Sequence, residues 1–122
     1  MFDFAFLVSA IVMVVIDYVY LYLFKGYFSN QIKNVQGSPL SMNLLAAAIC
    51  YIFLILGLNY FIIKPRRSVR DAFLLGIVIY GVYETTNWSI FKNWSIFTVI
   101  LDTLWGGTLF AATTFIVHLL HL

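Results

Sequence analysis

The stretch FAFLVSAIVMVVIDYVYLYLF, from Phe4 to Phe24, decides the fold class, because it is an apolar segment long enough to cross a bilayer as one helix. About 20 helical residues, each rising about 1.5 Å, cross a hydrocarbon core of about 30 Å. Of the 122 residues in the chain, 63% are hydrophobic, 19% are aromatic and 10% are charged. Soluble domains carry about 25% charged residues. The composition therefore predicts an integral membrane protein whose partner is the lipid bilayer.

Three further apolar segments predict one all-α domain, residues 1–122, that is a polytopic bundle of four transmembrane helices. The predicted spans are residues 4–24, 41–63, 71–91 and 95–117. A polar stretch from Lys25 to Leu40 is predicted as the loop between the first two spans. No segment alternates polar and apolar residues with a period of two, so the pattern favours a helical bundle over a barrel.

The basic residues indicate which side of the membrane faces the cytoplasm. Of the seven lysines and arginines, four lie between the second and third spans: Lys64, Arg66, Arg67 and Arg70. Loops rich in lysine and arginine remain on the cytoplasmic side. With four spans, both termini are predicted to lie on that side as well. The N-terminus lacks a basic region, so the first segment is predicted to be a retained helix and not a cleaved signal peptide.

Three carboxylic acids lie inside predicted spans: Asp17, Glu84 and Asp102. Each costs about 2.5–3.5 kcal/mol near the centre of a membrane helix, and such residues usually face the bundle interior. Each of the three lies seven residues from the predicted outer end of its span. At 1.5 Å per residue, all three are about 10 Å below the same membrane edge. We expect them to meet in one polar pocket that opens toward the outer side.

Aromatic and amide side chains accompany these acids, several of them at helical spacing on the same face. The candidate ligand- or ion-binding residues are Asp17, Glu84, Asp102, Asn87, Tyr80, Tyr83, Tyr20 and Trp105. Neighbouring carboxylates in a low dielectric need either protons or a bound cation. The pocket therefore suits the binding or transport of protons, cations or small polar solutes.

Two other interpretations remain open. In the first, the protein is a structural or accessory membrane protein whose polar core only fixes the packing of the helices. In the second, it is a small intramembrane enzyme that acts on lipid, with the carboxylates as acid and base. A four-span chain is short for a transporter, so a transport role implies a homodimer or a larger assembly.

Other chemistry finds no support in the sequence. No His, Cys and carboxylate set has the spacing of a zinc site, so no metal-binding residue is assigned. No phosphate-binding glycine loop and no nucleophile elbow is present, so no catalytic residue and no cofactor is assigned either, and an enzyme is the less favoured class. A net charge of +2 gives no reason to expect nucleic acid.

Trp88 and Trp94 are predicted to lie at the outer membrane interface, where tryptophan is favoured.

The segment YGVYETTN, from Tyr80 to Asn87, resembles a family of small bacterial membrane proteins known as domain of unknown function 2177. Members of that family read similarly to YGxYDLTN, followed by a tryptophan and then by DxxWG. The matching residues here are Tyr80, Gly81, Tyr83, Glu84, Thr86, Asn87, Trp94, Asp102, Trp105 and Gly106, and Asp17, Tyr27, Tyr51 and Pro65 also fit. The resemblance covers nearly the whole chain and implies a four-helix membrane fold with the acidic pocket, but no activity. Glu84 replaces the usual aspartate, so this acid reaches one methylene further.

The predicted orientation is testable by cysteine labelling in a Cys50→Ser background. A membrane-impermeant thiol reagent added outside should label Asn34→Cys and leave Ser68→Cys unlabelled, because the basic loop that contains Ser68 faces the cytoplasm. Labelling after the membrane is permeabilised controls for the reactivity of each cysteine. The reverse pattern would contradict the orientation.

Overall fold

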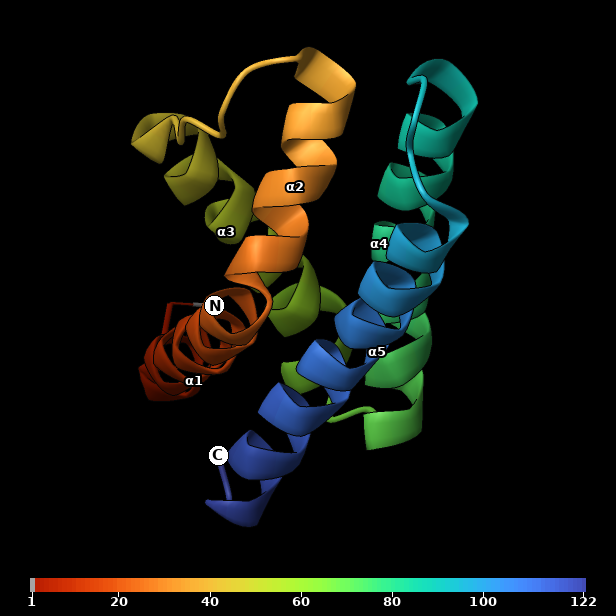
Figure 1. Ribbon diagram of the computed structural model, residues 1–122. Helices are drawn as coiled ribbons and strands as arrows, with labels where there is room; N and C mark the ends of the chain where they lie inside the picture. Colours follow the sequence, from red (N-terminus) through yellow and green to blue (C-terminus); the bar gives the residue numbers. More distant parts are fainter. Residues whose placement is uncertain (1) are drawn as a thin grey trace.

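The computed structural model describes residues 2–122, and these fold almost entirely into helices (Figure 1). The chain is 81% helical, and no strand occurs in the described residues. The elements in order are α1 (Phe4–Leu23), α2 (Lys25–Gln36), α3 (Leu44–Leu58), the π-helical turn η1 (Asn59–Ile63), α4 (Val69–Ile90) and α5 (Ile96–Leu119). The predicted all-α class is therefore confirmed.

Three helical segments are long and apolar enough to cross a membrane: Phe4–Leu23, Leu44–Ile63 and Ile96–Leu119. Helix α4 has 22 residues, but it carries Arg70, Asp71 and Glu84 and falls outside this group. The multi-pass membrane character is thus established by three helices, and the fourth span stays a prediction.

The stretch from Lys25 to Leu40 was expected to be a loop, and this expectation is wrong because its first twelve residues form α2. No proline interrupts the stretch before Pro39. Gly37 adopts a left-handed conformation (φ 76°) and its N–H donates to the carbonyl of Lys33, which ends the helix. Polarity alone does not separate a loop from a helix that packs by a polar face, and α2 packs in that way on the turn between α4 and α5.

Capping side chains set where three helices begin, and they explain why the predicted span boundaries shift by a few residues. Asn43 accepts from the N–H of Ala46, so α3 begins at Leu44 and not at residue 41. Ser68 accepts from the N–H of Asp71, so α4 begins two residues before the predicted span. Ser95 caps α5 in the same way. In each case the side-chain oxygen satisfies a backbone donor that has no partner inside its helix.

Helices α4 and α5 form an antiparallel hairpin and lie side by side (Figure 1). Glycines permit the contact. A β-carbon on Gly76 would collide with the carbonyl group of Gly106 and would lie 2.9 Å from the Cα of Gly107. A β-carbon on Gly106 would collide with the ring of Tyr80. Small residues allow membrane helices to approach closely, so these glycines set the spacing of the hairpin.

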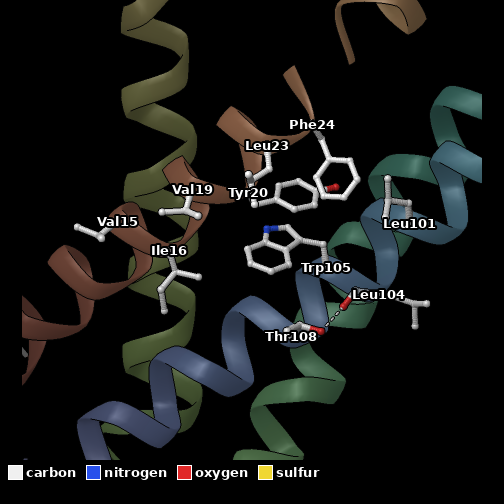
Figure 2. Close-up of a pocket in the computed structure, with 10 residues that line it drawn as sticks. All are labelled: Val15, Ile16, Val19, Tyr20, Leu23, Phe24, Leu101, Leu104, Trp105 and Thr108. Atoms are coloured by element: carbon white, nitrogen blue, oxygen red, sulfur yellow. Dashed lines mark hydrogen bonds between the residues drawn. The ribbon is translucent and has the colours of Figure 1, made fainter. Parts of the chain in front are cut away.

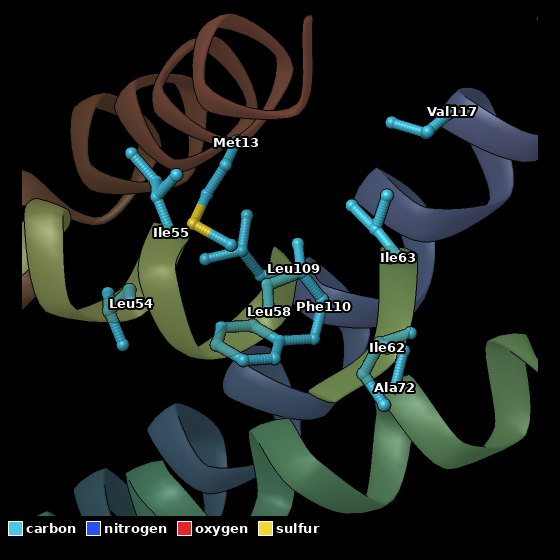
Figure 3. Packing of buried hydrophobic residues seen from close by; sticks show 10 residues of the cluster. All are labelled: Met13, Leu54, Ile55, Leu58, Ile62, Ile63, Ala72, Leu109, Phe110 and Val117. Atoms are coloured by element: carbon cyan, nitrogen blue, oxygen red, sulfur yellow. The ribbon is translucent and has the colours of Figure 1, made fainter. Parts of the chain in front are cut away.

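The apolar core fills one half of the bundle. Met13, Leu58, Leu109 and Phe110 are fully buried there, and Figure 3 shows them converging from α1, α3 and α5. Asp17, Glu84 and Asp102 all lie on the other side of these residues along their helices, nearer to the turn between α4 and α5. We call the two ends of the bundle the hairpin end, at residues 91–95, and the terminal end, at Asp3 and Lys64.

The start of α1, the α3–α4 loop and the end of α5 meet at the terminal end. A small cavity is lined by Asp3, Lys64, Arg66 and Leu122, which come from all three segments. His118 also hydrogen-bonds the backbone carbonyl of Arg67 over 2.8 Å. The two ends of the described chain and the basic loop therefore share one end of the bundle.

Replacing Gly76 by alanine tests the hairpin contact. Gly76→Ala should lower the free energy of unfolding by about 1–3 kcal/mol, because an added methyl group forces apart two packed backbones. Gly57→Ala is the matched control, since nothing lies within 4 Å of a β-carbon at that position. Unfolding in mixed detergent micelles measures both variants. Equal stabilities would contradict the close approach of α4 and α5.

Candidate functional site

A cavity of about 640 Å³ lies among α1, α3, α4 and α5 in the half of the bundle toward the hairpin end. Two carboxyl groups face it, those of Asp17 and Asp102. The rest of its wall is mainly apolar and aromatic. The other lining residues are Tyr20, Leu21, Ala46, Ile49, Cys50, Phe53, Leu54, Ile79, Tyr80 and Tyr83. The cavity is thus a partly open, mainly apolar space with two acidic groups in its wall, and lining residues such as Phe53 and Tyr83 are exposed.

Asp17 is the acidic group that joins three helices. Its side chain is 6% exposed, and Oδ1 accepts a hydrogen bond of 2.8 Å from the indole N–H of Trp105 on α5. Its other oxygen, Oδ2, accepts from the hydroxyl of Tyr51 on α3. Asp17 therefore ties α1 to both α3 and α5.

Asp102 accepts a hydrogen bond whose donor is on α1 and whose acceptor is on α5, the reverse of the bond from Trp105 to Asp17. The hydroxyl of Tyr20 on α1 donates to Oδ1 of Asp102 on α5 over 3.2 Å. The rings of Tyr20 and Trp105 are parallel and stacked, with centroids 4.3 Å apart and 2° between their planes. Figure 2 shows this stack, which also lines an apolar groove of about 580 Å³ between α1 and α5. Each aromatic residue thus stacks on its partner and donates to the acid on the other helix.

Glu84 lies behind Asp102 and does not line the cavity. Its side chain is 1% exposed, and Oε1 accepts from the indole N–H of Trp94 over 3.0 Å. Its carboxyl group is also an electrostatic neighbour of the carboxyl group of Asp102. Two neighbouring carboxyl groups in a low-dielectric site need a proton or a cation to offset their like charges.

Trp94 was predicted to lie at the outer membrane interface, and it lies in the turn between α4 and α5, at the hairpin end. The residue is buried and its N–H bonds to Glu84, so it belongs to the surroundings of the acids. The pentapeptide Asn-Trp-Ser-Ile-Phe occurs at residues 87–91 and again at residues 93–97. Trp88, from the first copy, is half exposed. The two tryptophans of the repeated sequence therefore lie in different environments, one buried and one half exposed, which only the fold distinguishes.

The structure brings most of the predicted site residues together around the cavity. Five of the eight line it, namely Asp17, Asp102, Tyr20, Tyr80 and Tyr83. Trp105, Glu84 and Asn87 do not line it. Trp105 bonds to Asp17, and Glu84 is a neighbour of Asp102. Asn87 is buried on α4.

Three residues outside the predicted set belong to the site: Tyr51, Trp94 and Cys50. Tyr51 bonds Asp17, Trp94 bonds Glu84, and Cys50 lines the cavity. Only the family motif gave a signal for Tyr51 and Trp94. No spacing rule relates residues on different helices, so their contacts with the acids could not be derived from the sequence.

The three acids have no cationic partner within the described chain. Among residues 2–122, the one ion pair joins Arg67 to Asp71 over 3.1 Å, on the surface at the terminal end. Hydroxyl and indole donors stabilise the acids but supply no positive charge. Burying an ionised carboxylate is expensive unless a positive charge accompanies it. The site therefore has acceptor capacity and negative charge to offer to a proton or a cation.

Helix α2 covers the hairpin end through one buried side chain, that of Gln31. Its Oε1 accepts from the hydroxyl of Thr98 (2.7 Å) and the backbone N–H of Ser95 (3.1 Å), while its Nε2 donates to the carbonyl of Asn93 (2.8 Å). The hydroxyls of Tyr27 and Thr98 lie 2.5 Å apart. These bonds fix α2 on the turn between α4 and α5, beyond the acidic half of the bundle.

The fold and the site define a class: a small, helical, multi-pass membrane protein with a carboxylate-lined cavity. The chain belongs to the family described as predicted membrane protein (DUF2177), whose family profile matches residues 2–119. This match confirms the resemblance drawn from the sequence motif. No curated protein and no solved structure matches the chain.

The bond between Trp105 and Asp17 can be tested by a double-mutant cycle. Trp105→Phe retains a ring for stacking but removes the donor, so it should lower the free energy of unfolding by about 1–2 kcal/mol. Combined with Asp17→Asn, the loss should be smaller than the sum of the two single losses. Trp88→Phe, at a half-exposed position, is the control and should have little effect. Strictly additive losses would contradict the bond.

Proposed function

We propose that this protein binds a cation in the cavity between Asp17 and Asp102, as a step in the transport of protons, cations or small polar solutes. The observation that carries the proposal is the absence of any basic partner for the buried acids within residues 2–122. Two of these acids face a cavity large enough for a ligand. A positive charge in the cavity would offset the cost of keeping them ionised.

The dimensions and the wall of the cavity favour an organic cation over a bare metal ion. Ligand pockets commonly enclose about 300–1,000 Å³, and this cavity of about 640 Å³ lies within that range. Tyr80 and Tyr83 in its wall offer aromatic faces, which attract cations. An ammonium group at the acids would leave its apolar substituents against Phe53 and Leu54.

We infer that α4 is the fourth span of a single four-helix domain, with spans near residues 4–24, 41–63, 71–91 and 95–117. Its 22 residues extend about 33 Å, enough to cross the hydrocarbon core. The segment Leu44–Ile63 ends at the terminal end, and α5 begins at the hairpin end. The connection between them therefore has to cross.

This arrangement also bears on orientation and assembly. The basic loop supports a cytoplasmic location for the terminal end and hence for both termini. The acidic cavity, in the half toward the hairpin end, would then open on the outer side. Four spans provide little room for a complete translocation path, so a homo-oligomer is part of the proposal.

A second candidate is a structural or accessory role. It is favoured by the satisfied state of the acids, since Asp17, Glu84 and Asp102 each accept a hydrogen bond from a tyrosine or a tryptophan. Such bonds fix the pairing of membrane helices without any ligand. In this case the wild-type protein would bind no cation, and loss of an acid would change stability alone.

Reconstitution in liposomes separates the two candidates. We expect wild-type protein to take up radiolabelled methylammonium and to release internal protons that a trapped pH dye reports. Asp17→Asn and Asp102→Asn should each lower uptake by about tenfold or more, because each removes a charge that compensates the cation. Glu84→Gln should alter the accompanying proton movement, since it removes the ionisable group that neighbours Asp102.

Asp71→Asn is the matched control. It removes an acid of the same type from the exposed start of α4, outside the cavity lining, and should leave uptake unchanged. Titration of detergent-solubilised protein with methylammonium and tetraethylammonium measures binding without transport. If wild-type protein binds neither cation and moves no protons, the structural candidate holds and the proposal is wrong.

A further inference from the structure

The terminal end contains a second, separate polar cavity of about 130 Å³. Its polar lining residues are Asp3, Asn59, Lys64 and Arg66, and its apolar wall consists of Ala5, Ile63 and Leu122. Water occupies about 30 Å³ per molecule in the liquid, so the cavity has room for a group the size of about four waters. It shares no lining residue with the carboxylate cavity, and the proposed cation binding gives it no role.

Asn59 lines this cavity and carries an acceptor that no other described residue uses. Its side chain is 3% exposed, and its Nδ2 donates to Oγ of Ser9 and to the carbonyl of Ile55, both over 2.9 Å. The bond to a carbonyl fixes which end of the amide is the nitrogen. Its Oδ1 accepts no hydrogen bond from any described residue. Oδ1 is not one of the fully buried atoms that lack a partner in the described residues, which are the hydroxyl oxygens of Thr103 and Thr114. It is therefore accessible to a donor that enters the cavity.

The backbone around Asn59 is unusual in two places. Residues Asn59–Ile63 form a π-helical turn, a rare conformation that occurs often at functional sites. Arg66 adopts a positive φ of 57°, which costs energy for a residue with a β-carbon. The π-helical turn joins Asn59 to the basic loop. Arg66, the residue with the positive φ, also lines the cavity.

The rim of the cavity carries both positively and negatively charged side chains. Lys64 and Arg66 provide cationic donors, and Asp3 provides a carboxylate. One oxygen of Asp3 caps α1 by accepting from the N–H of Phe6, which leaves its second oxygen free to accept another bond. A ligand that fits this rim therefore carries an anionic group for the two basic residues and a cationic N–H donor for Asp3.

The depth of the cavity suits the headgroup layer of the bilayer. Asp3 immediately precedes the span Phe4–Leu23, and Lys64 immediately follows the span Leu44–Ile63. These two residues therefore lie where the hydrocarbon core gives way to the polar headgroups. A headgroup can reach the cavity from there while its acyl chains remain in the membrane.

We propose that the cavity at the terminal end binds the phosphoethanolamine group of a membrane phospholipid. The phosphate pairs with Lys64 and Arg66, and the primary ammonium donates to Asp3 and to Oδ1 of Asn59. Phosphatidylcholine carries the same charges, but its quaternary ammonium has no N–H to donate. Phosphatidylglycerol has no cationic group at all. The site therefore selects by hydrogen bonding and not by net charge.

Native mass spectrometry of the detergent-purified full chain tests this site. Titration with phosphatidylethanolamine should give a Kd about tenfold lower than with phosphatidylcholine or phosphatidylglycerol, which is the effect of one hydrogen bond to a charged group. Asp3→Asn should reduce this preference, because asparagine caps a helix as well as aspartate but carries no charge. Lys64→Gln should weaken binding of phosphatidylethanolamine by a similar factor.

Arg70→Gln is the control, because Arg70 belongs to the same basic loop but does not line the cavity. It should leave the lipid preference unchanged. Titration with free O-phosphoethanolamine distinguishes the source of the group: tight binding of the lipid assigns a headgroup, whereas equally tight binding of the free compound assigns a solute and contradicts the lipid. Equal affinity for all three phospholipids, or an equal effect of Arg70→Gln and Lys64→Gln, would overturn the proposal.

Discussion

The crossed pair of hydrogen bonds between α1 and α5 is the interaction on which the acidic half of the bundle depends. Tyr20 of α1 bonds Asp102 of α5, and Trp105 of α5 bonds Asp17 of α1, while the two rings stack between these bonds. An acid exposed to lipid would lose all of these partners. The cost of burying two carboxyl groups therefore fixes how α1 faces α5, and the cavity forms where these helices meet α3 and α4.

The rest of the fold separates packing from polarity along the helix axes. Within the pair of helices α4 and α5, Gly76 allows the backbone of α4 to approach that of α5 closely. The half toward the terminal end is filled mainly by apolar side chains such as Met13 and Phe110. The half toward the hairpin end contains the cavity with acids in its wall. A membrane protein without a large hydrophobic driving force between its helices obtains specificity from such polar contacts.

The two cavities divide the possible chemistry between the two ends of the molecule. The larger one has two carboxyl groups as its only charged groups, in an apolar and aromatic wall, so it offers a site for a positive charge. The smaller one has both signs of charge at the level of the headgroups, and Asn59 supplies a free acceptor. The core around Leu58, Leu109 and Phe110 lies between them.

Composition and periodicity determined the class of the protein, because lipid imposes strict requirements on any segment that crosses it. The long apolar segments predicted membrane helices, and the common depth of Asp17, Glu84 and Asp102 followed from counting residues along each helix. The direction of a side chain around its helix also follows partly from spacing, which is why Tyr20 and Trp105 were predicted to accompany the acids of their own helices. These properties are local to one helix, and a sequence records them directly.

Contacts between helices were decided by the tertiary structure alone. The sequence does not say that Tyr51 reaches Asp17, that Trp94 turns inward to Glu84 while Trp88 does not, or that Glu84 stands behind Asp102 and away from the cavity. It also did not reveal α2, because the polarity of this stretch predicted a loop, whereas Gln31 of the helix bonds to the hairpin turn. Each of these features depends on the rotation and the spacing of whole helices. Those are set by the packing of all the helices together, which no single segment encodes.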